Sequence, residues 1–173
     1  MFAVALENGI NCLDLYSPDP AAHRRIGRAI ARVRKQFYLQ AHFCTEWKNE
    51  QYEAVRDLPR VRDAFERMLQ NLGTDYIDIG NIHFVDSMDT WRQILDNGVM
   101  DYVQEQNKQG IIRAVSLSSH NPIVALEAVK SGCLDALLFS INPCCVNCQG
   151  EIEDLSKIIV KFPHFCNEAK RKL

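Results

Sequence analysis

Short apolar runs alternate along the chain with segments whose apolar residues recur every three or four positions. A short apolar run bounded by turn residues is typical of a buried strand, and the longer spacing is typical of an amphipathic helix. Strands are expected within residues 10–16, 37–43, 74–86, 111–118 and 134–141. Because strand and helix alternate strictly, the pattern predicts an α/β fold with a parallel sheet of five strands.

Capping and turn residues mark where the intervening helices begin and end. Asp19 is a good N-cap and Pro20 a good first helical residue, and Gly73 and Gly110 are suited to end later helices. Helices are expected at 2–7, 20–34, 61–72, 99–109 and 122–130. Residues 44–59 are expected to form a long functional loop, since most connections are shorter, and a second irregular loop is expected before residue 99.

The composition fits one globular domain. The 173 residues are 47% hydrophobic and 24% charged, which supplies a sizeable core. A formal net charge of −2 offers no basic surface, so nucleic-acid binding is disfavoured. No apolar run approaches the ~18 residues of a membrane span, and the N-terminus lacks signal-peptide features. We therefore expect a soluble cytoplasmic protein with no membrane partner, whose seven cysteines are free thiols.

The strand within residues 74–86 ends in a histidine, His83, just before a polar turn. In parallel α/β proteins the carboxyl ends of the strands are where ligands bind and catalysis takes place. His83 is therefore the first candidate for a functional residue.

Several blocks of sequence together resemble the aldo-keto reductases. They are residues 7–14, 72–78, 82–83, 110–114 and 118–120, and the likeness runs in order and in spacing from residue 1 to about 143. The resemblance implies a TIM (βα)8 barrel that reduces small-molecule aldehydes or ketones with NADPH or NADH. This chain supplies what would be strands two to six, so we expect a partial barrel of about five parallel βα units over residues 1–143.

The resemblance also implies a catalytic tetrad of Asp, Tyr, Lys and His at the strand ends. In that family the Tyr is the general acid, the Lys lowers its pKa, the Asp holds the Lys, and the His orients the carbonyl. Asp14 and His83 match the family's Asp and His. His42 stands at the position of the Lys and Asp19 at that of the Tyr, so two members are replaced.

Each replacement has two interpretations. Asp19 suits a helix N-cap better than an acid, since a carboxyl would need a raised pKa to donate a proton. Tyr16 lies two residues from Asp14, on the same face of the strand, and is a candidate replacement acid. His42 can act as a proton donor, or be a hydrogen-bonded histidine with no chemical role. Asp14 is expected to be buried and to need partners, for which His42 and His83 are candidates.

Three residues are candidates for binding the nicotinamide cofactor. In the family a Ser-Asn pair binds the carboxamide of the nicotinamide. Ser118 matches the serine of this pair, whereas Ser119 stands in place of the asparagine. The third candidate, Asn142, follows the last expected strand. The alternative for the two serines is that they cap the turn before Pro122. The late barrel loops that hold the cofactor's phosphates in this family have no counterpart in the chain.

Residues 144–173 read as a divergent tail with one helix, near 151–160. Cys145 and Cys148 have C-x-x-C spacing, and His164 and Cys166 follow. A single C-x-x-C is a weak metal signal, so ordinary thiols are favoured and no metal is assigned.

Two functions remain open. The first is an aldo-keto-reductase-like oxidoreductase whose activity is impaired because the tetrad Tyr and Lys are replaced. The alternative is a catalytically inactive, truncated barrel that acts as an interaction or regulatory module. Five strands cannot close a barrel, so unpaired sheet edges would also be available for self-association.

Overall fold

A computed structural model describes residues 2–139 of the chain, and one parallel sheet forms its centre. The sheet has the five strands predicted, and they lie in the order β1-β2-β5-β6-β7. They are β1 (Cys12–Leu15), β2 (Tyr38–Phe43), β5 (Ile77–Ile82), β6 (Ile112–Ser119) and β7 (Ala136–Phe139). All four pairings are parallel, so the carboxyl ends of all five strands lie at the same end of the sheet.

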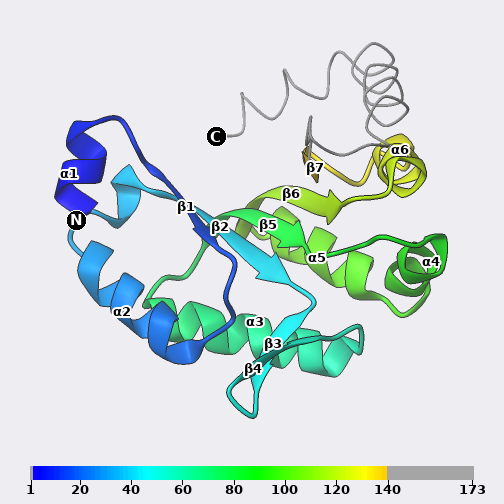
Figure 1. Cartoon of the computed structure of the whole chain (residues 1–173), viewed down its shortest axis with the longest axis horizontal. Coiled ribbons are helices and arrows are strands. Elements are labelled where there is room, and N and C mark those ends of the chain that lie inside the picture. Colours follow the sequence, from blue (N-terminus) through cyan, green and yellow to red (C-terminus); the bar gives the residue numbers. More distant parts are fainter. Residues whose placement is uncertain (1, 140–173) are drawn as a thin grey trace, which may run out of the picture.

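Helices connect the strands and form an arc around one side of the sheet, which gives a half-barrel (Figure 1). They are α1 (Phe2–Glu7), α2 (Pro20–Ile30), α3 (Leu58–Leu72), α4 (Met88–Asp96), α5 (Val99–Lys108) and α6 (Pro122–Lys130), with a short 3-10 turn, η1, at Arg34–Gln36. The predicted partial barrel of five strands with alternating helices is confirmed for the described residues.

The hydrophobic core lies between the sheet and these helices. Leu39, Ile77 and Leu117 from three neighbouring strands are fully buried, and Val61 and Phe65 of α3 are buried with them. Helices α2 and α3 approach closely at Gly27, where a Cβ atom would lie 2.2 Å from the backbone oxygen of Leu72. The two helices can therefore pack this closely only because residue 27 has no side chain.

A buried carboxylate fixes the amino-terminal end of the sheet. Asp78 is 1% exposed and accepts hydrogen bonds from Arg34 at 3.0 Å, Arg113 at 2.9 Å and the backbone N–H of Leu39 at 2.9 Å. Both guanidinium groups also lie about 4 Å from the ring centre of Tyr76. The register of β2 against β5 is thus held at the end opposite to His83.

Two expectations about loops are wrong. Residues 44–59 contain an antiparallel hairpin, β3 (Thr45–Lys48) with β4 (Gln51–Ala54), whose turn residues Asn49 and Glu50 have φ of 50° and 59°. The expected irregular loop before residue 99 contains α4, which Ser87 caps by accepting a hydrogen bond from the N–H of Thr90. The predicted end of α2 at residue 34 is also too late, since the helix ends at Ile30.

The remaining expectations concern the cysteines, membrane-spanning helices and the C-terminal residues. Cys12, Cys44 and Cys133 are free thiols. Between residues 2 and 139, no helix has the length and apolar character needed to cross a membrane. Asn142, the helix expected near 151–160 and the C-x-x-C segment lie outside the described residues.

Candidate active site

Three predicted residues meet at the carboxyl ends of neighbouring strands. Asp14 is on β1, His42 is on β2, and His83 directly follows β5. Parallel register places Asp14 beside Gln40 and His42 beside Asn81, so the three side chains lie across adjacent strands. The sheet therefore brings together residues that are far apart in the sequence.

The three side chains form one hydrogen-bonded chain. His42 Nε2 lies 2.6 Å from Asp14 Oδ1, and His42 Nδ1 lies 2.8 Å from His83 Nδ1. His42 and His83 are 5% and 7% exposed, respectively. The Asp14 side chain is 50% exposed, so the expectation that this carboxylate is buried is wrong. Its position at an edge strand leaves it open to solvent while His42 still contacts it.

Two arrangements of protons fit this chain. In one, His42 is neutral, donates from Nε2 to Asp14, and accepts at Nδ1 from the Nδ1–H of His83. In the other, His42 is an imidazolium and donates from Nδ1 to His83, which then carries its proton on Nε2. Asn81 Nδ2 lies 3.4 Å from His42 Nδ1, and Ser116 holds the Asn81 amide by donating to Oδ1 at 2.9 Å.

The surroundings set the charges in the chain. Burial, followed by the positive charges of His42 and Arg56, lowers the pKa of His83 from 6.5 to about 4. The hydrogen bond from His42 lowers the pKa of the Asp14 carboxyl. At neutral pH, His83 is therefore uncharged and Asp14 is a carboxylate. A neutral imidazole can orient a carbonyl group by donating a hydrogen bond, or accept a proton at its free nitrogen.

Aromatic rings surround His83 and are open to solvent. The rings of Tyr16 and Tyr52 contact His83 edge to face, with centroids 5.6 Å and 5.8 Å away, and Phe84 lies 5.8 Å away. These three side chains are 58%, 38% and 49% exposed, respectively. Among residues 2–139, neither tyrosine hydroxyl has a hydrogen-bond partner, so both are available to a ligand.

Tyr52 is a site residue that the sequence analysis missed. It lies on β4 of the hairpin that was expected to be an irregular loop, and its ring stacks parallel to that of Tyr16 at 6.4 Å. Burial raises the pKa of its phenol. The only signal available was the unusual length of the segment, because hairpin pairing and not local pattern brings Tyr52 over His83.

Asp19, which stands at the family's Tyr position, lies outside this chain of residues. Its carboxylate caps α2 by accepting hydrogen bonds from the N–H groups of Ala21 at 2.8 Å and Ala22 at 3.1 Å. The interpretation of Asp19 as a helix cap is therefore confirmed. Both oxygens of this carboxyl group accept backbone hydrogen bonds, so the group serves the helix end and not the site around His83.

The two serines differ in what they can still bind. Ser119 is 1% exposed, and its hydroxyl contacts Asp86 at 3.4 Å and the backbone of Asn121. It caps the turn before α6 and does not fit as a ligand for a nicotinamide carboxamide. Ser118 accepts a hydrogen bond from the N–H of Phe84 at 2.9 Å, and its Oγ also lies 3.5 Å from His83 Nδ1. Of the two, Ser118 alone fits as a donor to that group.

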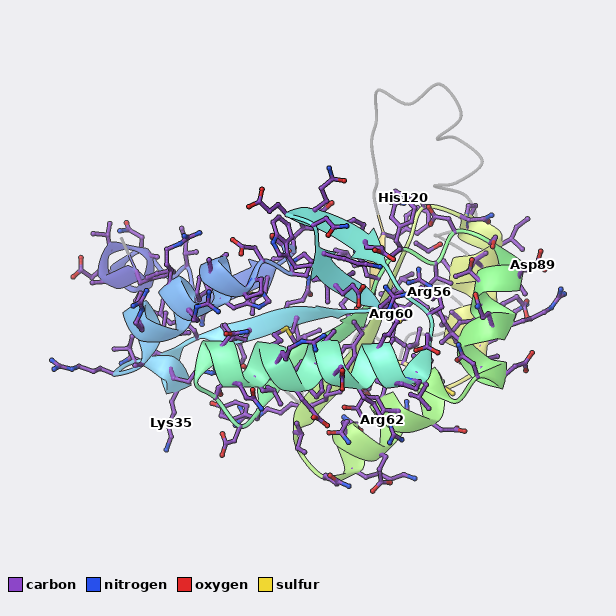
Figure 2. The ribbon with its side chains drawn as sticks, turned by 90° about the horizontal axis from the view of Figure 1, so that it is seen from below. Lys35, Arg56, Arg60, Arg62, Asp89 and His120 are labelled. Atoms are coloured by element: carbon purple, nitrogen blue, oxygen red, sulfur yellow. The ribbon has the colours of Figure 1, made fainter. Side chains whose placement is uncertain are left out.

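Arg56 is a second residue that the sequence analysis missed. One terminal nitrogen donates to the carbonyls of Cys44 and Val55, and the other donates to those of His83 and Phe84, all at 2.9–3.0 Å. Cys44 and Phe84 have φ of 66° and 59°, which is unfavourable for residues with side chains. Figure 2 shows Arg56 and His120 at the end of the molecule opposite Lys35. Arg56 thus links the segments that directly follow β2 and β5 by hydrogen bonds to their carbonyl groups.

Known proteins are similar to this chain in sequence. The model of the aldo/keto reductase family matches residues 1–151. The aldo-keto reductase YhdN of Bacillus subtilis is 28% identical over 122 residues, which cover 66% of this chain and 34% of that protein. The chain therefore spans about a third of the length of this relative.

Solved structures show the same fold. A putative aldo-keto reductase from Pseudomonas aeruginosa superposes with a TM-score of 0.72 at 22% identity, covering 88% of this chain and 58% of that one. The holo form of aldo-keto reductase AKR11C1 from Bacillus halodurans gives a TM-score of 0.64 at 25% identity, covering 79% of this chain and 45% of that one. The described half-barrel therefore corresponds to part of a longer TIM barrel.

Proposed function

The chain belongs to the aldo/keto reductase family, and from that membership we propose that it takes part in hydride transfer between NADPH or NADH and an aldehyde or ketone. The observation that supports this most directly is the hydrogen-bonded chain from Asp14 through His42 to His83. Its members stand where the family's Asp, Lys and His stand, at the carboxyl ends of adjacent strands.

His83 binds the carbonyl oxygen. Its Nε2 has no hydrogen-bond partner among residues 2–139, and it carries a proton when His42 is an imidazolium. A bound nicotinamide cofactor would supply the hydride, and Ser118 would offer that cofactor a hydroxyl donor. As negative charge develops on the carbonyl oxygen, His83 donates from Nε2 and His42 donates to His83 Nδ1. The proton lost by His42 is thus delivered through His83, and Asp14 stabilises the charged form of His42.

The rim around His83 suggests the class of substrate. Tyr16, Tyr52 and Phe84 present exposed rings on the sides of the imidazole. Aromatic faces and edges bind other aromatic groups favourably. Small aryl aldehydes and ketones are therefore the first compounds to test. Tyr16 is a second candidate for the acid, since its side chain is exposed and its ring contacts that of His83.

A catalytically inactive interaction module is the second candidate function. It is favoured by Asp19, whose carboxylate is occupied by helix capping, and by the higher pKa of Tyr52, which makes that phenol a poorer acid. A tyrosine acid of the family type therefore has no direct counterpart among residues 2–139.

Cofactor binding and turnover distinguish the two candidates. Fluorescence titration of the purified chain with NADPH and NADH should give a saturable signal below millimolar concentration, and a panel of aryl aldehydes should oxidise the cofactor. His83→Ala should abolish turnover, whereas Arg92→Ala, a change of an exposed side chain on α4, should not. Absence of any binding signal at millimolar cofactor would contradict hydride transfer, and His83-dependent turnover would contradict the inactive module.

A further inference from the structure

We propose that the chain of Asp14, His42 and His83 also catalyses proton exchange at the α-carbon of a bound ketone, with no cofactor present. The proposal rests on the proposed function only in placing a carbonyl compound beside His83. It concerns a different reaction, in which a proton and not a hydride is transferred.

The geometry that supports this activity is the contact between two imidazole nitrogens. When His42 donates from Nε2 to Asp14, its Nδ1 accepts the Nδ1–H of His83, and His83 Nε2 carries a lone pair. That nitrogen has no hydrogen-bond partner among the described residues, and the three aromatic rings that contact the His83 imidazole are exposed. His83 therefore presents a base toward the position where a ligand would lie.

The step conserves atoms and electrons. His83 Nε2 takes the α-proton, the C–H electron pair forms a carbon–carbon double bond, and the carbonyl π pair moves to oxygen. His83 passes its Nδ1 proton to His42 Nδ1, so the positive charge comes to rest on His42 beside the Asp14 carboxylate. In D2O the Nε2 proton of His83 exchanges with solvent, and reversal returns a deuteron to carbon. The net change is C–H and D2O to C–D and HOD, without an oxidant or reductant.

The two ring nitrogens of His42 make the relay. A side chain with a single nitrogen at this position could contact Asp14 but could not accept a proton from His83 while donating to the carboxylate. The carbonyl oxygen needs a donor when it becomes an enolate. The hydroxyls of Tyr16 and Tyr52 lie on the rim of the site and have no hydrogen-bond partner within residues 2–139.

The site thus favours a ketone with an aryl group and an acidic α-hydrogen. The parallel rings of Tyr16 and Tyr52 and the ring of Phe84 lie 5.6–5.8 Å from the ring of His83, centroid to centroid, and all three side chains are exposed. Phenylacetone has an aryl group next to an activated methylene, so it is a suitable probe.

Proton NMR measures the reaction directly. The full chain is mixed with phenylacetone in D2O without nicotinamide cofactor, and loss of the methylene signal is followed against buffer alone. We expect exchange about a hundredfold faster than with the same concentration of His83→Gln. His42→Lys, which restores the family's residue, should lose the exchange as well. Arg92→Gln, at an exposed position of α4, is the control and should exchange at the rate of the unchanged chain.

A variant on the exposed rim keeps the test independent of folding. Tyr16→Phe combined with Tyr52→Phe removes both hydroxyl donors from half-exposed rings, and should slow the exchange at least about tenfold. Thermal unfolding of every variant is recorded in parallel. Exchange that is no faster than in buffer, or that persists in His83→Gln, would overturn the proposal.

Measuring cofactor oxidation in separate samples keeps the two proposals distinguishable. Reduction of aryl aldehydes without cofactor-free exchange would overturn proton exchange and leave hydride transfer standing. Exchange that depends on His83 and His42 without any cofactor oxidation would support proton exchange and contradict hydride transfer.

Discussion

The Nδ1 atoms of His42 and His83 lie 2.8 Å apart, so the two imidazoles share a single proton. Two lone pairs or two protons would repel each other along this line. The protonation state of His42 therefore selects whether His83 presents an N–H or a lone pair at Nε2. This coupling has measurable consequences for stability and for activity.

Two substitutions of His42 should separate its two contacts. In His42→Gln the amide reaches the position of Nε2 and keeps the contact with Asp14, whereas in His42→Asn it reaches Nδ1 and keeps the contact with His83. Each variant should lose about 1–3 kcal/mol of unfolding free energy, because a polar group is left without its partner. His42→Gln should lose carbonyl reduction more severely, since it disconnects His83. Equal activities in steady-state assays of the two variants would contradict the coupling.

The stability of the protein should fall as the pH drops from 6.5 toward 4. Unfolded His83 takes up a proton near pH 6.5, but in the folded chain its pKa is about 4, so below pH 6.5 the unfolded state binds more protons. The unfolding free energy is therefore not reduced by His83 above pH 6.5, where this histidine is neutral in both states. The groups that act on His83 are His42, Arg56, Asp14 and His120.

Urea unfolding at several pH values measures this dependence. His83→Gln removes the titrating group, so the slope of unfolding free energy against pH between 6.5 and 4 should be smaller than in the unchanged chain. A residual slope is expected, because burial also lowers the pKa of His23. Parallel curves for the two proteins would show that His83 titrates normally in the folded state.

Asp19 should matter for stability and not for chemistry. Asp19→Ala removes both hydrogen bonds to the first turn of α2 and should cost about 1 kcal/mol. Asp19→Asn keeps an acceptor and should cost less. Thermal unfolding checks the order of stability, and turnover should be unchanged in both variants. A large loss of activity in Asp19→Asn would instead give this carboxylate a catalytic role.

Arg56 should be essential for the position of His83. Arg56→Met leaves the four carbonyl groups without their shared donor and should cost about 2–3 kcal/mol, with a larger effect on kcat than on cofactor binding. Arg92→Met, which changes an exposed arginine, is the control and should stay within about 0.5 kcal/mol. Equal effects of the two substitutions would show that the carbonyl contacts contribute nothing.

Local pattern was sufficient for the sheet but not for the parts of the site that depend on pairing. Capping by Asp19 and termination at Gly73 follow from residues that are close in sequence, and both are found in the structure. The hairpin has Asn49 and Glu50 in its turn instead of glycine, so the usual signal of such turns is missing. Tyr52 was missed for this reason.

Contacts between distant residues set the remaining features. Arg56 has no motif around it, and its role follows only from the approach of the carbonyls of Cys44 and Phe84. The pairing of His42 with His83 depends on the parallel register of β2 and β5, which no local spacing encodes. The resemblance supplied the positions of both histidines, and the structure supplied the link between them.

Asp78 should be the most sensitive position at the opposite end of the sheet. Its carboxylate is 1% exposed and pairs with Arg34, whose side chain is 13% exposed, and with Arg113, whose side chain is 47% exposed. Asp78→Asn removes the negative charge and leaves both guanidinium groups without their carboxylate partner, so it should cost about 3–5 kcal/mol. Asp75→Asn, an exposed change of the same type nearby, should cost less than about 0.5 kcal/mol. Urea unfolding measures both. A similar small loss in the two variants would mean that the attraction between Asp78 and the arginines only balances the cost of burying the carboxylate.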